Sequence, residues 1–189
     1  MNRKVAIGCT VVFILAAALI VAGGYYGPKL FKKGMSAVGD AMAESARLGK
    51  FEADWQPPSA QMDAGWFPKE VSAWKLVSAE PSPGIAKLNI DRAGQHAVYQ
   101  SATASVEVDV LAANDLEKDA LFKRAQDALS SGSGSRMTTT FGNRVHVRVN
   151  DEHTRLWWVK GWLFIFRARG ADPEKFTEEL LGAMGKPAA

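Results

Sequence analysis

Histidine, arginine and carboxylate side chains gather in one short stretch, HVRVNDEH, at residues 146–153. His146, His153 and Asp151 or Glu152 could meet at one turn, and imidazole and carboxylate groups are ligands of divalent metals. Arginines flank the two histidines on both sides, and nearby cations oppose the binding of a positively charged ion. We therefore expect neither a metal site nor a cofactor here.

Catalytic motifs are missing from the rest of the chain. Cys9 is the only cysteine and lies in an apolar N-terminal run, so thiol catalysis and cysteine-based metal sites are excluded from the remainder. No G-x-S-x-G motif of a serine hydrolase is present. The adjacent Glu178 and Glu179 are predicted on a helix that faces water. The sequence predicts a protein that is not an enzyme.

The N-terminus carries the features of a membrane anchor. Residues 5–24 are uncharged and apolar, and about 20 such residues span the hydrocarbon layer of a bilayer. We predict a transmembrane signal anchor over residues 1–28. A cleaved signal peptide is the alternative, because Ala16 and Ala18 form an A-x-A site. Cations flank the run on both sides, so the positive-inside rule alone leaves either orientation open. The short N-terminal end favours a single-pass protein of the inner membrane whose domain faces the periplasm or cell exterior.

The positive charge of the chain belongs to this anchor region. Residues 1–50 contain seven lysines and arginines against two acidic residues, whereas residues 51–189 contain sixteen against eighteen. Cations beside an apolar segment meet anionic lipid headgroups. The remaining domain is slightly acidic, so we expect no nucleic-acid partner.

The spacing of apolar residues and the composition predict how the rest of the chain is divided. Residues 29–50 space their apolar side chains as one helical stripe, which predicts an amphipathic juxtamembrane helix that acts as a spacer, self-associates or binds a partner. Residues 51–65 contain two prolines without a periodic pattern and are predicted as a linker or strap. Residues 66–185 form the globular domain, and residues 186–189 are a tail.

Alternating strand patterns and helical patterns predict an α+β fold for the globular domain. Asn114 and Glu117 form a capping-box pattern at the start of one helix, and Asp172 followed by Pro173 begins the second. We expect an antiparallel sheet with the two helices packed on one face. The predicted strands are IAKLNI (85–90), HAVYQS (96–101), TASVEVDVL (103–111), RMTTTFG (136–142), NRVHVRVN (143–150), TRLWWV (154–159) and WLFIFRARG (162–170).

This order of elements resembles that of PsbP-like α/β sandwich domains and of small membrane-anchored bacterial domains of unknown function. The resemblance covers roughly residues 66–185 and rests on the succession of strands and helices. It implies a sheet covered by helices and carries no catalytic residues to this chain.

The last strands form predicted hairpins with an unusual composition. A turn at Lys160 and Gly161 pairs Trp157 with Phe164, and a turn at Asn150 and Asp151 pairs Arg148 with His153. Both faces of the strand pair are then apolar, so each needs a cover. One face grades from cationic to aromatic side chains, and its members are the candidate binding residues Arg144, His146, Arg148, Arg155, Trp157, Trp162, Phe164 and Phe166.

Three covers for this face remain open. The strap over residues 51–67 folds back onto it with Trp55, Trp66 and Phe67, a protein partner covers it, or an amphiphile with an acidic head binds its arginines. The predicted function is therefore that of a membrane-anchored extracytoplasmic binding or interaction domain, with a protein partner or self-association. Binding or sensing of an amphiphile is the alternative.

Overall fold

The chain divides into two compact units in the computed structural model, Met1–Ala53 and Asp54–Ala189. The structure describes residues 28–59, 61–131 and 135–185. The predicted transmembrane segment and the tail lie outside these residues. The first unit contributes most of one long helix, α2 (Pro28–Asp54), where the amphipathic juxtamembrane helix is predicted. Among the described helices, none is long and apolar enough to span a bilayer.

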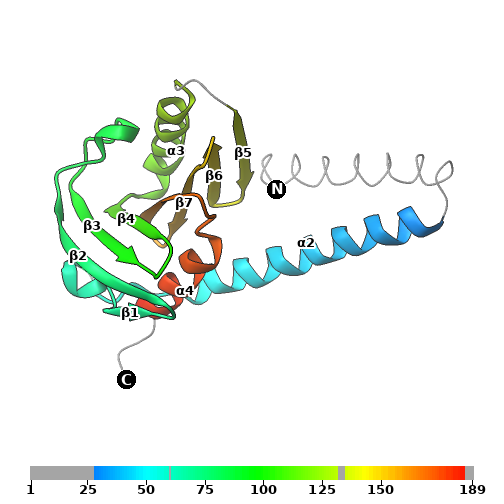
Figure 1. The fold of residues 1–189 in the computed structure, drawn as a ribbon, viewed down its shortest axis with the longest axis horizontal. Coiled ribbons are helices and arrows are strands. Elements are labelled where there is room, and N and C mark those ends of the chain that lie inside the picture. Colours follow the sequence, from blue (N-terminus) through cyan, green and yellow to red (C-terminus); the bar gives the residue numbers. More distant parts are fainter. Residues whose placement is uncertain (1–27, 60, 132–134, 186–189) are drawn as a thin grey trace. The chain divides into compact units, whose positions relative to one another are not determined.

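The second unit is built on an eight-stranded antiparallel sheet (Figure 1). The strand order is β1-β2-β3-β4-β8-β7-β6-β5, so β1 and β5 form the two edges. The strands are β1 (Glu70–Val71), β2 (Trp74–Ser82), β3 (Gly94–Gln100), β4 (Ser105–Ala112), β5 (Arg136–Phe141), β6 (Arg144–Val149), β7 (Glu152–Val159) and β8 (Trp162–Arg169).

Two α-helices and two short 3-10 helices complete this unit. Helix α3 (Asp115–Ser130) begins with the predicted capping box between Asn114 and Glu117. Helix α4 (Glu174–Met184) begins one residue later than predicted, with Pro173 at the capping position, and the Asp172 carboxylate accepts a hydrogen bond from the Glu174 amide. The 3-10 helices are η1 (Ala64–Trp66) and η2 (Ala86–Leu88).

The two α-helices cover opposite faces of the sheet, so the expectation that both pack on one face is wrong. Helix α3 contributes Leu121 to the core that contains Ile165, whereas Phe176 of α4 packs against Phe166 on the other face. Side chains of successive strand residues point to opposite faces. Because both faces of β8 are apolar, each requires a cover, and the helices divide that task.

The expectation of a strand over residues 85–90 is wrong, because Ala86–Leu88 form the 3-10 helix η2. Ile85 and Ile90 close a bridge, and Asn89 between them takes a left-handed conformation with φ of 53°. Asparagine tolerates this conformation better than most residues, so the chain turns back within six residues. Ile85, Leu88 and Ile90 are nevertheless buried, as an apolar pattern requires.

The predicted register of the last two hairpins is confirmed. Trp157 pairs with Phe164 across the turn at Lys160 and Gly161, and Arg148 pairs with His153. Both turn residues have positive φ, 48° for Lys160 and 82° for Gly161. Positive φ at both positions is the conformation of a two-residue turn that matches the twist of the flanking strands.

Candidate functional site

The eight candidate binding residues share one face of β6, β7 and β8, as their register requires. Three of the four aromatic side chains in this set are buried. Phe164 and Phe166 have no exposed surface, and Trp157 is 2% exposed. These side chains are core residues and cannot contact a partner, which corrects their assignment as a binding surface.

The cover over the aromatic half is the predicted strap. Trp55 meets Phe164 edge-on at 5.7 Å between ring centres, and Trp66 meets the half-buried Trp162 at 4.7 Å. Trp55 also donates a hydrogen bond of 2.9 Å to the Leu181 carbonyl. The predicted strap begins later than expected, because α2 extends to Asp54, and its part from Trp55 onward belongs to the second unit. The first of the three covers is therefore the one that the structure contains.

The cationic half is largely engaged within the chain. Arg155 donates two hydrogen bonds to Asp172, of 2.6 and 2.7 Å, and its guanidinium also lies 3.2 Å from Glu174. Arg144 lies over the Trp157 ring at 3.7 Å, and Arg148 donates to the Asn150 carbonyl at 2.9 Å. Arg155 is therefore not available to an acidic headgroup.

A cavity beside Arg144, Arg155 and Trp157 has a volume of about 20 Å³. Pockets for drug-sized ligands occupy roughly 300–1,000 Å³. This cavity has room for about one water molecule and gives no support to a bound amphiphile.

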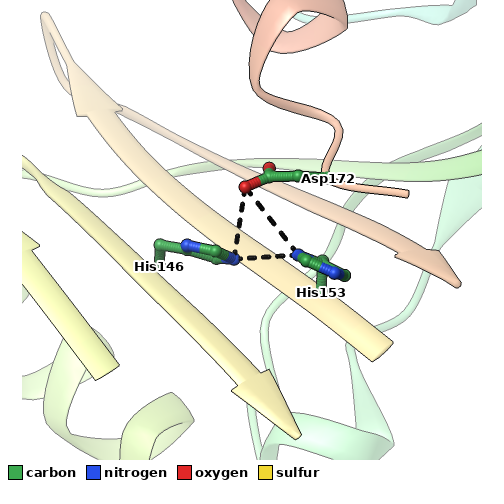
Figure 2. A group of neighbouring side chains, drawn as sticks. All are labelled: His146, His153 and Asp172. Carbon is green, nitrogen blue, oxygen red and sulfur yellow. Dashed lines mark hydrogen bonds and ion pairs between the residues drawn. The ribbon is translucent and has the colours of Figure 1, made fainter. Parts of the chain in front are cut away.

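His146 and His153 lie together on the same face and meet Asp172 (Figure 2). His146 Nε2 and His153 Nδ1 are 3.2 Å apart, and Asp172 Oδ2 lies 3.8 Å from each of them. The side chains are 12%, 10% and 35% exposed, respectively. The sequence placed both histidines at one turn, but the carboxylate comes from the loop before α4 and not from Asp151 or Glu152.

Burial and the charge of Arg155 act on the pKa of two groups in this cluster, His146 and Asp172. Burial, followed by the charge of Arg155, lowers the pKa of His146 below its usual value. Burial opposes ionisation of Asp172, but the hydrogen bonds and charge of Arg155 prevail and hold the pKa of that carboxyl below its usual value. At neutral pH, these shifts favour a neutral His146 imidazole beside an ionised Asp172 carboxylate.

The outer strand β5 is a feature that the sequence analysis did not single out. All six of its residues are exposed, including Met137 at 53% and Phe141 at 50%. Met137 pairs with Arg148 and Phe141 with Arg144, so both apolar side chains share the face of the candidate residues. The exposed strand β5 therefore forms one partly exposed surface with its neighbours Arg144, His146 and Arg148.

A second polar cluster lies on the face of the sheet that α3 partly covers. His96 Nδ1 lies 2.8 Å from Asp109, and Arg167 donates to the same carboxylate at 2.7 Å. Asp109 is only 3% exposed, although charged residues that alternate with valines along a strand usually face water. Hydrogen bonding to Asp109 raises the pKa of His96.

Comparison with known proteins gives a likeness of fold. No protein-family model matches the sequence, and no curated protein matches it. A solved structure of a GTP binding regulator from Thermotoga maritima aligns with a TM-score of 0.51 and 19% identity. The alignment covers 72% of this chain and 96% of that chain. At this identity the likeness concerns the fold alone.

Proposed function

We propose that this chain is a single-pass domain of the inner membrane, facing the periplasm or cell exterior, that binds a protein partner through β5 and performs no catalysis. The supporting observation is that β5 is an edge strand with every residue exposed. The binding surface consists of β5 and the adjacent side chains Arg144, His146 and Arg148 of β6. We call it the β5 surface.

The backbone of β5 supports recognition by strand addition. An edge strand presents unpaired N–H and C=O groups, and proteins usually protect such an edge with proline, charged side chains or a bulge. The six residues RMTTTF contain one charged residue, Arg136, and no proline, and they pair residue by residue with β6 without a bulge. An extended partner segment can extend the sheet at this edge with main-chain hydrogen bonds.

The side chains of the β5 surface define the chemistry of that partner. Met137 and Phe141 offer apolar contacts on one face, while Arg136 is exposed on the strand itself. Arg144 and Arg148 lie one strand further in, about 10 Å from an added strand. A partner segment with acidic side chains and alternating apolar residues complements this arrangement.

A second copy of this chain is an alternative occupant of the same edge. Two β5 strands in antiparallel register place Arg136 opposite Phe141 and Thr138 opposite Thr139, so like charges do not meet. The amphiphile alternative is less favoured, because the cavity beside Arg144 and Arg155 is only about 20 Å³. The partner proposal rests on the open edge and on its cationic surroundings.

Photo-crosslinking in intact cells tests the proposal. A photoreactive amino acid at Thr139 on β5 is compared with one at Leu116 on α3, which is 91% exposed. We expect one adduct of defined mass from Thr139 and none from Leu116, with the crosslinked peptide of the partner rich in Asp or Glu. An adduct of twice the chain mass would assign the edge to a second copy. The same adducts at both positions would refute the β5 surface.

A further inference from the structure

The donor atoms of His146, His153 and Asp172 are spaced as in a metal centre (Figure 2). A tetrahedral ion bound to nitrogen and oxygen at about 2.0–2.2 Å holds neighbouring donor atoms roughly 3.3–3.6 Å apart. The observed separations are 3.2 Å between the imidazole nitrogens and 3.8 Å from each nitrogen to the carboxylate. The three separations thus lie within about 0.2 Å of the edges of one tetrahedral face.

We propose that His146, His153 and Asp172 bind one divalent transition-metal ion of the zinc class. The ion would take its fourth ligand from solvent, because the three side chains retain some exposure. Two nitrogen donors and one oxygen suit Zn²⁺ and its first-row neighbours. Mg²⁺ and Ca²⁺ are disfavoured, because they prefer oxygen ligands throughout.

The charge of Arg155 is offset by two carboxylates, which weakens the argument from sequence that nearby arginines oppose a metal ion. Arg148 donates to the Asn150 carbonyl, and Arg155 lies between the carboxylates of Asp172 and Glu174. A carboxylate has about four lone-pair sites, so Asp172 can accept the bidentate Arg155 and still donate to a metal. Arg155 then acts as an outer partner that orients a ligand, a role typical of metal sites.

The hydrogen bond between the two imidazoles sets a condition for binding. His146 Nε2 and His153 Nδ1 lie 3.2 Å apart in a hydrogen bond, so one of these nitrogens carries a proton in the metal-free chain. That ring must carry its proton on the other nitrogen before both atoms bind an ion, because a metal binds an unprotonated ring nitrogen.

Calorimetry on the full chain tests this site. The chain is kept in a mild detergent, stripped of metal with a chelator and titrated with Zn²⁺. We expect one ion per chain, and we expect His153→Gln and Asp172→Asn each to weaken binding by at least roughly tenfold. His96→Gln is the matched control, because His96 pairs with Asp109 in the separate cluster on the other face. Unchanged zinc affinity in His153→Gln, or no binding by the folded unmodified chain, would overturn the proposal.

Cobalt provides a readout that needs no variant, should His153→Gln fail to fold. Co²⁺ in a tetrahedral protein site absorbs visible light strongly, whereas the six-coordinate aqueous ion absorbs weakly. Intense visible bands that appear with one equivalent of Co²⁺ and disappear on addition of Zn²⁺ would support the site. Only the weak bands of the aqueous ion would overturn it. Neither result depends on the partner at the β5 surface.

Discussion

Arg155 on β7 holds Asp172, in the loop before α4, through two hydrogen bonds of 2.6 and 2.7 Å. The contact joins residues that are 17 positions apart in the chain. It ties the start of α4 to the sheet, because Asp172 also accepts the amide of Glu174 at the first turn of that helix. The same pair positions the carboxylate of the proposed metal site.

Arg155→Ala should lower stability by about 1–3 kcal/mol, because it removes two charge-assisted hydrogen bonds. The lower end of this range is expected, since Asp172 is partly exposed and water can replace the lost donors. Arg155→Lys keeps the charge but not the planar fork, so it should recover only part of the loss. Urea unfolding of the full chain measures the effect. Equal stability of the alanine variant would show that the pair contributes little.

Removal of the Trp55 ring should expose the aromatic face. Trp55 is 3% exposed and contacts Phe164 and Leu181, so Trp55→Ala should cost about 3–5 kcal/mol. Trp55→Phe keeps an aromatic ring but loses the N–H donor, and its cost should be smaller. Chemical denaturation with both variants checks the order. A mild effect of the alanine variant would mean that the strap does not seal the sheet.

Stability should depend on pH through His96. The hydrogen bond that this imidazole donates to Asp109 raises its pKa in the folded chain. A group with a raised folded pKa contributes its stability below its unfolded pKa of about 6.5 and loses it as the pH rises through the folded value. The unmodified chain should therefore lose stability relative to His96→Gln as the pH rises above 6.5. Melting temperatures of both proteins across this range test the sign, and a constant difference would contradict it.

Asn114→Ala should destabilise α3 by about 1 kcal/mol. The Asn114 side chain accepts hydrogen bonds from the amides of Leu116 and Glu117, and the Glu117 carboxylate accepts from the Asn114 amide. Asn114→Ser retains an acceptor at the cap and serves as the control. Thermal unfolding should rank the serine variant between the other two proteins. An alanine variant with the same melting temperature as the unmodified chain would show that the cap does not stabilise the fold.

The sequence predicted the hairpins well because their determinants are local. The turn residues Asn150, Lys160 and Gly161 take positive φ, and this fixes which strand residues are opposite one another. The same registers correctly placed Trp157 and Phe164 on one face. The capping box at Asn114 was predictable for the same reason, since it involves residues only three positions apart.

Features that depend on distant contacts were not predictable in this way. Asp172 lies in the loop between β8 and α4 and reaches histidines 19 and 26 positions earlier in the chain, a contact that no local pattern encodes. The position of α3 and α4 on opposite faces likewise depends on the whole chain. Asp109 shows why an alternating pattern does not always predict exposure. This charged side chain is buried because it contacts His96 and Arg167. The resemblance to PsbP-like domains stays a prediction.

The most direct test of the proposed function combines one substitution with the crosslinker at Thr139. Met137→Glu places a negative charge on the β5 surface at a side chain that is 53% exposed, so the fold should persist while an acidic partner is repelled. Leu116→Glu on α3 is the matched control at an exposed apolar position. We predict that the Thr139 adduct disappears in Met137→Glu cells and persists in Leu116→Glu cells, with equal amounts of folded chain. An adduct that persists in both would contradict binding at the β5 surface.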